Sequence, residues 1–503
     1  MVNRLRHARW IACCLAVFVV FCSDMRAQEA ASEKAARVRY DGAMKFLQEQ
    51  KYAEGVRDLK EIVQIYKDSR VASSALLQLA LYYLEIAGDP ASALTHVDTL
   101  LKNYDQSDSA PLARVLHGRI TMAMSRTPAS IESALADYGR VQNWYPHSDS
   151  VPVAQYYAGE TLRVTHREEE AAQYYREASS GYPQSIWAAR ALLGEAQCLV
   201  RSGDIPRAME ALQQVRMRFS PRPEATTAAA WNTTLYRLYV RSGAHPPFEF
   251  RGKTVAGPAG KLKDVIALAL PADGSLIAAT RSTLVRLDAT GRPQAVAAGN
   301  GPSAIAFDPS GNLLVAVRGG LTLPDGKFVS LWIPKPDGTR RQLEEIPGLV
   351  VNSVGRILVI DKTAKTVARF SSDGNYVSSL NMGAADRLII DNTDTMALLL
   401  TDEPSVVLID QDGKVAARIP KMGKRYQFDN PVDIAFDPFG HLYVLDRGLG
   451  AVFVFKADGA FVTSFSIPQK AAGVFRHATA LALDAAGRLY VADDSAEKVQ
   501  VYQ

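Results

Sequence analysis

The chain has 503 residues, of which 48% are hydrophobic and 22% are charged, and its formal net charge is +4 at pH 7. This length predicts two or three domains, and the composition is ordinary for a globular protein, which excludes a collagen-like or low-complexity chain. The small net charge is shared between both halves and lacks the bulk positive charge that favours phosphate binding, so nucleic acid is not an expected partner.

Residues 1–27 have the pattern of a secretory signal peptide. Three arginines lie within the first nine residues, an apolar run too short to span a bilayer follows, and Ala27 is a small residue suited to cleavage. The alternative is a lipoprotein whose Cys22 carries a lipid that anchors it to the membrane. The sequence therefore predicts an exported protein, either periplasmic, bound to the cell envelope or secreted. Of the four cysteines only Cys198 lies beyond this segment, which excludes an internal disulfide framework.

Residues 28–243 carry an internal repeat. Aromatic residues recur about every 37 to 41 residues, and a small residue precedes each by 11 positions. The aromatics are Tyr66, Tyr104, Tyr145, Tyr182 and Phe219, and the small residues are Gly55, Ala93, Ala134, Ala171 and Ala208. We expect each unit to be two helices: the aromatic ends the second helix, prolines at 146 and 183 prevent its continuation, and the serine three residues after the first four aromatics caps the next helix. The small residues allow helices to cross closely.

Segments such as YLEIAGDPASAL (83–94) and CLVRSGDIPRAMEAL (198–212) resemble the tetratricopeptide repeat family, including the long-repeat versions of bacterial cell-envelope proteins. The resemblance covers about residues 33–243 and implies an α-solenoid with a concave groove that binds peptides or proteins. The repeated aromatics are interpreted as helix-packing core rather than groove anchors. HREEE (166–170) is interpreted as a solvated charge run at a turn rather than a metal site.

After a linker at 244–247, the periodicity of residues 248–503 changes from helical to strand-like. Six related segments follow one another, each with a tight turn between short apolar strands. Their turn positions are Gly274, Gly311, Gly355, Asp394, Gly440 and Gly487. Units of this length predict propeller blades. The last copy lacks an outer strand, which FEFRGKTVA (248–256) is expected to supply, and the second copy has an insertion around LTLPDGKF (321–328). The pattern, seen best in LYVADDSAEKVQVY (489–502), resembles the NHL-repeat six-bladed β-propeller.

Acidic residues end three of the aligned strands of this propeller. Asp361, Asp446 and Asp493 are followed by Lys362, Arg447 and Asp494, and together these six form the candidate ligand-binding face. Two interpretations stay open. The aspartates could form a ring that holds a metal or cationic ligand, or each could accept hydrogen bonds from loop amides of its own blade. The second is favoured.

No catalytic, metal-ligating or cofactor-binding residues are predicted. The propeller half has only His441 and His477, at non-equivalent places, and the chain contains no nucleophile elbow, zincin or phosphate-loop motif. The favoured interpretation is therefore an exported, non-enzymatic scaffold or adaptor. It would bind protein partners, mainly envelope proteins, through the solenoid groove and one propeller face, where a glycan or small ligand is a further possibility. The alternatives are a metal-dependent propeller enzyme of lyase or lactonase type and a sensor of a small ligand or glycan.

Overall fold

The computed structural model describes residues 30–241, 246–257, 260–271, 273–288, 290–295, 301–335, 337–420, 427–466 and 476–503. The predicted signal peptide lies outside these ranges, and so do the first two residues of the predicted linker. The chain forms two compact units, residues 1–157 and 158–503. The change from helix to strand falls close to the predicted linker, but the helices after residue 157 belong to the same compact unit as the propeller.

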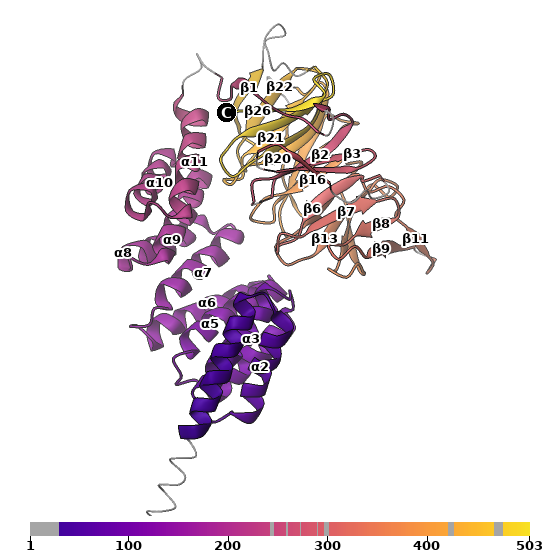
Figure 1. The fold of residues 1–503 in the computed structure, drawn as a ribbon. Helices are drawn as coiled ribbons and strands as arrows, with labels where there is room; N and C mark the ends of the chain where they lie inside the picture. The colour runs from indigo at the N-terminus through magenta and orange to yellow at the C-terminus, as the bar shows by residue number, and fades with distance from the viewer. Residues whose placement is uncertain are drawn as a thin grey trace, which may run out of the picture. The chain divides into compact units, whose positions relative to one another are not determined.

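The first unit consists of helical hairpins (Figure 1). A helical segment at 30–48 precedes its named helices. These are α2 (Tyr52–Ile65), α3 (Val71–Glu85), α4 (Pro90–Asn103), α5 (Ala110–Met124) and α6 (Pro128–Trp144), followed by α7 (Val151–Val164), within which the division at residue 157 falls. The small residues predicted at the helix crossings, Ala93 and Ala134, are fully buried. Among the described residues, none of the helices combines the length and the hydropathy that crossing a bilayer requires.

The predicted boundaries between hairpins are confirmed at the four tyrosines, whereas the predicted serine caps are confirmed only in part. Tyr66, Tyr104, Tyr145 and Tyr182 are the residues that cap the C-termini of α2, α4, α6 and the later helix α8 (Glu168–Gly181). The hydroxyl oxygens of Ser69, Ser148 and Ser185 each accept a hydrogen bond from the amide two residues later, at 3.1 to 3.2 Å, as capping residues do. The hydroxyl of Ser107 has no such partner.

The tyrosines also connect successive repeats. The Tyr104 hydroxyl donates to the backbone oxygen of Lys67 at 2.5 Å, and the Tyr145 hydroxyl donates to that of Asp105 at 3.0 Å. Each acceptor directly follows the tyrosine of the preceding repeat. This explains why the repeat uses tyrosine here, because phenylalanine would leave the carbonyl without this donor.

The second unit begins with the remaining helices: α8, α9 (Ile186–Ser202), α10 (Ile205–Phe219), α11 (Pro223–Leu235) and a π-helical turn, η1 (Tyr236–Val240). Their contact surfaces again depend on small residues. The buried Tyr175 ring lies between Gly159 and Gly194, where an added Cβ atom would come within 2.6 and 2.5 Å of ring atoms. Cys198 is buried in α9.

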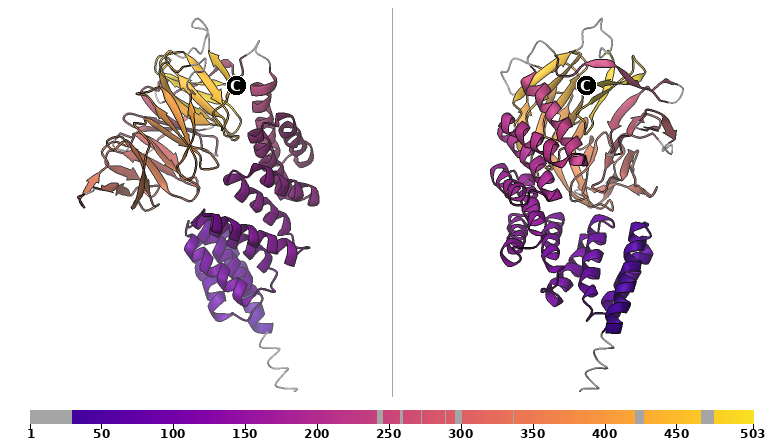
Figure 2. Two further views of the ribbon diagram at one scale, coloured as in Figure 1. Left: turned by 180° about the vertical axis from the view of Figure 1, so that it is seen from behind. Right: turned by 60° about the vertical axis from the view of Figure 1, so that its left-hand side comes forward.

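A six-bladed β-propeller follows, which confirms the predicted fold class (Figures 1 and 2). Each blade is a four-stranded antiparallel sheet, and every ladder pairs sequence neighbours except in the last blade. The first three blades contain β2 (Val265–Ala269), β3 (Leu276–Thr280), β4 (Leu284–Leu287) and β5 (Pro293–Ala295); β6 (Ala304–Phe307), β7 (Leu313–Val317), β8 (Gly320–Thr322) and β9 (Phe328–Ser330); and β12 (Leu349–Val351), β13 (Ile357–Asp361), β14 (Thr366–Phe370) and β15 (Tyr376–Asn381). The last three contain β16 (Arg387–Ile390), β17 (Met396–Leu400), β18 (Ser405–Ile409) and β19 (Val415–Ile419); β20 (Pro431–Phe436), β21 (Leu442–Asp446), β22 (Ala451–Phe455) and β23 (Phe461–Ser466); and β24 (Ala478–Leu483), β25 (Leu489–Asp493) and β26 (Lys498–Tyr502) with β1 (Phe250–Val255).

The ring closes as predicted. β1 pairs antiparallel with β26, with Phe250 opposite Tyr502 and Val255 opposite Val499, and so completes the sixth blade. The two ends of the propeller sequence therefore share one sheet, in which β1 is the outer strand and covers the edge that β26 would otherwise leave unpaired.

The prediction for the second blade needs a correction. Residues 321–328, expected as an insertion, form the ordinary hairpin turn between β8 and β9. The additional element is a separate two-stranded sheet of β10 (Trp332–Pro334) and β11 (Arg340–Gln342). Both hairpins contain a Pro-Asp-Gly turn, so turn chemistry alone could not tell the blade hairpin from the extra one.

One arginine connects blades across the ring. Arg387 of β16 donates from Nη2 to the backbone oxygen of Ile266 on β2 at 3.3 Å, and its Nε lies 3.3 Å from Asp433 Oδ1 on β20, as an ion pair without hydrogen-bond geometry. The other Asp433 oxygen accepts the amide of Leu481 on β24 at 2.7 Å. Burial raises the pKa of Asp433, and the charge of Arg387 opposes that rise.

Candidate functional site

The three aspartates of the predicted propeller site are buried at strand ends and serve the loops beside them. Asp446 accepts the amides of Asp429, Asn430 and Leu449 at 2.8 to 3.1 Å. Asp493 accepts amides from both loops that flank its strand in the same way, among them Arg476 at 2.8 Å and Ser495 at 2.8 Å. Asp361 forms an ion pair with Arg341 and accepts the amide of Ala364 at 3.2 Å. For Asp446 and Asp493 these contacts are those that the own-blade interpretation expects, whereas the Arg341 partner of Asp361 belongs to the separate β10–β11 sheet.

The other three predicted residues do not converge on one point. Lys362 Nζ lies 2.7 Å from a carboxylate oxygen of Asp386, at the start of the next blade. Asp494 accepts the amide of Asp264 at 2.9 Å, across the join between the sixth and first blades. Arg447 bonds through its backbone to Asn430 and Gly450. The six residues thus lie in three different blades, and a ligand-binding role for them stays a prediction.

A second constellation lies on the turns that join the first two strands of the blades. In five blades the first turn residue is Asp or Asn, and its side-chain oxygen accepts the amides two and four residues later at 2.8 to 3.3 Å. These residues are Asp308, Asn352, Asp391, Asp437 and Asp484. Such a side chain fixes the turn backbone, and a fixed turn offers a defined surface for packing.

The last helices of the solenoid contact three of these turns, those of the fourth, fifth and sixth blades. The indole of Trp231 on α11 meets the ring of Phe439 edge-on, with centroids 5.2 Å apart. The Tyr239 hydroxyl on η1 lies 2.7 Å from Nε2 of His441, whose Nδ1 lies 2.7 Å from Asp437. Burial raises the pKa of Tyr239, so its hydroxyl stays protonated. Phe439 and His441 are both buried, and through them the fifth blade provides a contact surface for these helices.

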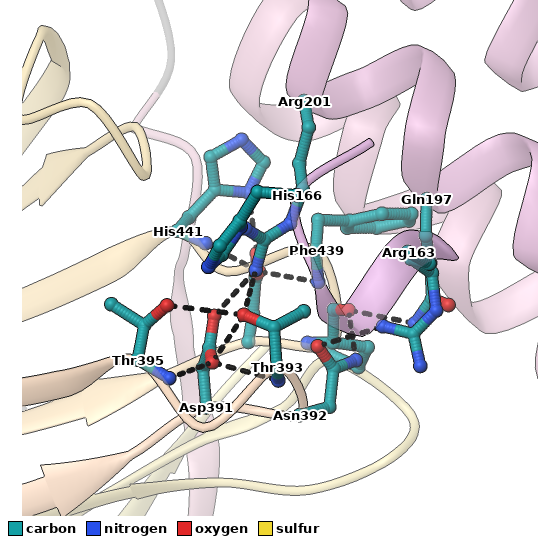
Figure 3. Close-up of polar contacts among 12 residues, drawn as sticks. Arg163, His166, Gln197, Arg201, Asp391, Asn392, Thr393, Thr395, Phe439 and His441 are labelled. Carbon is teal, nitrogen blue, oxygen red and sulfur yellow. Dashed lines mark hydrogen bonds and ion pairs between the residues drawn. The ribbon is translucent and has the colours of Figure 1, made fainter. Parts of the chain in front are cut away.

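An ion pair from α9 enters the equivalent turn of the fourth blade (Figure 3). Arg201 pairs with Asp391, and the side chains are only 7% and 2% exposed. The guanidinium also donates to the Thr393 hydroxyl at 3.2 Å. The other Asp391 oxygen accepts the amides of Thr393 and Thr395 at 2.8 and 2.9 Å and the Thr393 hydroxyl at 2.7 Å. Because every bond of this carboxylate is charge-assisted or made with a fixed donor, the pair ties helix and blade together.

A second row of polar bonds runs beside this pair (Figure 3). Arg163 at the end of α7 donates to the Asn392 side chain at 3.2 Å, and the amide nitrogens of Asn392 and Gln197 both donate to the backbone oxygen of Pro438, at 2.9 and 2.8 Å. Arg163 is also paired with Glu160 at 2.8 Å. Burial disfavours the charge of Glu160, but Arg163 outweighs it and lowers the pKa of that carboxyl. Three helices are therefore bonded to two adjacent blades.

A cavity of about 800 Å³ lies next to this junction. Its helical wall is the α7–α8 turn together with the end of α9, and its propeller wall is made by turns of the fourth and fifth blades. The lining residues are His166, Arg167, Glu168, Glu169, Glu170, Val200, Arg201, Ser202, Thr395, Asp410, Ala416, Phe439, His441, Lys456, Ala457 and Asp458. The volume is in the range of ligand sites, which often occur where two folds meet.

This cavity is lined by residues for which the sequence predicts no binding site. HREEE (166–170) was interpreted as a solvated charge run, and its glutamates are indeed partly or largely exposed, but the whole run lines the cavity. His441 was noted only as unsuited to a zinc site. A comparison of the hairpin turns could have drawn attention to position 166, because it holds histidine where two other turns hold glycine, at Gly88 and Gly203.

The reactive groups of this region are few. Burial raises the pKa of the Cys198 thiol to about 12, so it remains protonated and is a poor nucleophile. Across the part of the chain that the structure describes, no three His, Cys, Asp or Glu side chains gather closely enough to hold a metal ion. The cavity lining offers charged side chains, several fixed backbone turns, the phenyl ring of Phe439 and the imidazoles of His166 and His441.

Comparison with known proteins supports the helical assignment directly. Residues 166–231 match the family model of the tetratricopeptide repeat. No curated protein matches the chain. Among solved structures, the propeller half is similar to a streptogramin B lyase (12% identity, 51% of this chain and 97% of that chain, TM-score 0.38) and to an auxiliary nutrient binding protein from Bacteroides ovatus (13%, 50% and 73%, 0.40). A virginiamycin B lyase from Staphylococcus aureus is similar at 14% identity (48% and 80%, 0.34). At these values the structural likenesses carry no argument about activity. The chain thus combines tetratricopeptide-type helical repeats with a six-bladed propeller, two folds that commonly mediate protein interactions.

Proposed function

We propose that the protein is an exported, non-enzymatic adaptor that binds protein partners of the cell envelope through its helical repeats and through a face of its propeller. The observation that carries this proposal is the junction in residues 158–503. Buried bonds such as Arg201 to Asp391 and Tyr239 to His441 attach α9 and η1 to the fourth and fifth blades. An adaptor gains from such an attachment because two binding surfaces held in one body can engage partners together, which raises their combined affinity.

Export is supported by the signal-peptide pattern of residues 1–27. The non-enzymatic character is supported by the chemistry of the groups at hand: Cys198 is buried and protonated, and the buried carboxylates Asp446 and Asp493 are engaged by loop amides. A buried group that is fully hydrogen-bonded serves structure, whereas catalysis needs a group that reaches the substrate.

The test is affinity capture with the chain from residue 28. It would be immobilised and exposed to solubilised envelope proteins of the source organism, and retained proteins would be identified by mass spectrometry. A parallel column would carry Trp144→Ala, which removes a side chain that is 57% exposed on the helical repeats and stacks on Arg114 at 4.5 Å. We expect one recurrent protein on the first column and a change in its yield on the second if the repeats contribute. Retention of no protein, together with stoichiometric bound metal in the purified chain, would contradict the proposal and favour a metal-dependent enzyme.

A further inference from the structure

The turn between α7 and α8 has a histidine at a backbone position that favours glycine. Its residue His166 has φ +58°, in the left-handed region, as do Gln50, Gly88 and Gly203 in other hairpin turns. Only glycine adopts this region without a steric penalty, which for other residues is about 1–2 kcal/mol. The imidazole of His166 lines the junction cavity, so the conformation places a polar ring on the cavity wall.

The imidazole of His166 lies close to the carboxylate of Glu168. Nδ1 of His166 lies 3.6 Å from Oε1 of Glu168, the first residue of α8. Burial opposes ionisation of Glu168, but His166 and the charge of Arg201 outweigh it, so the pKa of Glu168 is lowered. A partly buried carboxylate therefore stays charged on the helical wall of the cavity.

The remaining lining charges are unequally available. Two of the cations are committed to carboxylates: Arg201 to the buried Asp391, and Arg167 to Glu170 at 2.7 Å. On the propeller wall, Asp410 and Asp458 each accept amides of their own turns through one carboxylate oxygen. Among the described residues, the second oxygen of each makes no hydrogen bond or ion pair. These two aspartates, with Glu168 and Glu169 opposite, outnumber the single lysine of the cavity, Lys456.

Apolar surface lies beside these charges. The Phe439 ring and the side chains of Val200, Ala416 and Ala457 line the same cavity. A lysine or arginine side chain combines an apolar stem with a cationic head, and such side chains bury the stem against apolar surface while the head stays with polar partners. A lining that combines apolar and acidic side chains matches that chemistry better than it matches an anion or a wholly apolar group.

We propose that the junction cavity is a docking site for an extended peptide segment of a partner protein that presents a lysine or arginine between Glu168 and Asp458. This inference deepens the proposed adaptor function and rests on it. Since one wall is helical and the other is propeller, an occupant contacts both folds, and the charge complementarity selects a cationic segment over an acidic one.

The test uses defined probes, so it does not depend on knowing the partner. Fluorescein-labelled hexapeptides of alanine and glycine would carry two central lysines, arginines, glutamates or leucines. Their binding to the chain from residue 28 would be measured by fluorescence polarisation at low and moderate salt. We expect the lysine and arginine peptides to bind at least about tenfold more tightly than the other two, since attraction of about 1.4 kcal/mol gives this factor. Equal binding of all four, or preference for glutamate, would overturn the proposal.

Two variants test whether the lysine peptide binds in the cavity. His166→Gly removes the imidazole at a position where glycine suits the backbone, and Asp458→Lys reverses a charge on an exposed turn. We expect each to weaken binding of the lysine peptide about tenfold or more. The matched control is Glu177→Gln, a half-buried acid on α8 outside the cavity lining, which we expect to leave binding of the lysine peptide unchanged. Unchanged binding in both cavity variants would overturn the proposal.

Failure of this inference can be told apart from failure of the adaptor function. A partner captured by the intact chain and retained equally by His166→Gly and Asp458→Lys would overturn the docking site while leaving the adaptor in place. Spermidine that binds as tightly as the lysine peptide would overturn the peptide as the occupant.

Discussion

Replacing Arg201 with methionine would leave the Asp391 carboxylate buried without its cationic partner. The pair is only 7% and 2% exposed, and removal of one member of such a pair typically costs about 3–5 kcal/mol. One oxygen of Asp391 would still accept the amides of Thr393 and Thr395, which offsets part of the loss. We therefore expect the free energy of unfolding of residues 158–503 to fall by about 3 kcal/mol, at the lower end of this range.

The assay is urea unfolding of the chain from residue 28, followed by tryptophan fluorescence, with hydrogen exchange of α9 and the 391–395 turn as a local readout. Trp231 packs against Phe439 at the junction and so reports on it. The control is Arg207→Met, which breaks a pair on α10 whose side chains are 55% and 36% exposed and should cost less than about 1 kcal/mol.

A second variant separates charge burial from lost packing. Asp391→Asn, combined with Arg201→Met, removes both charges, so the double variant should lose clearly less stability than the sum of the single losses. If Arg201→Met costs no more than Arg207→Met, or if the losses are additive, the ion pair does not hold α9 to the fourth blade and the reasoning about the junction is refuted.

Three further outcomes are expected. Gly440→Ala should destabilise the protein more than Gly311→Ala. Both positions have a positive φ, but only at 440 would the new Cβ atom lie 2.7 Å from the guanidinium of Arg201. Equal decreases of the urea midpoint in the two variants would contradict the close contact. The pKa of His117 is raised by its hydrogen bond to Asp137, so its contribution to stability should be complete below the unfolded value of about 6.5 and fade as the pH rises through the folded value. His117→Gln should abolish this part of the pH dependence in urea titrations, and an unchanged profile would argue against the bond. Arg387→Met should cost about 3 kcal/mol or more and raise the pKa of its buried carboxylate partner further, whereas a loss below about 1 kcal/mol would show that the inner strands do not depend on this bridge.

The sequence predicted the fold closely because both halves are built from repeats. Tyr104 and Tyr145 recur in register, and each does the same physical work in its own repeat, ending a helix and bonding to the preceding one. The blade turns are equally local, and the missing outer strand could be assigned to residues 248–256 because a propeller must close. The extra β10–β11 hairpin was misplaced, since its turn has the same chemistry as a blade turn.

The site was less predictable. Asp446 and Asp493 stand out in the sequence because they recur, yet in both blades the carboxylate accepts hydrogen bonds from loop amides. The pairs that meet across the junction follow no repeat, because at least one member of each pair has no counterpart in the other repeats: Arg201 pairs with Asp391 across 190 positions, and His441 contacts Tyr239 across 202. No repeat period of the sequence links the two members of such a pair, so the repeats could not predict that these residues meet.

The amino-acid sequence by itself thus determined the two folds, their order and the closure of the ring, because these depend on short-range patterns of size, polarity and turn chemistry that recur along the chain. Only the tertiary structure decided that the last helices form one compact unit with the propeller and that HREEE (166–170) borders a cavity with the fourth and fifth blades. The physical reason is that helix hydrogen bonds and blade ladders are local, whereas the junction consists of side chains far apart in sequence, whose meeting depends on how the completed elements pack.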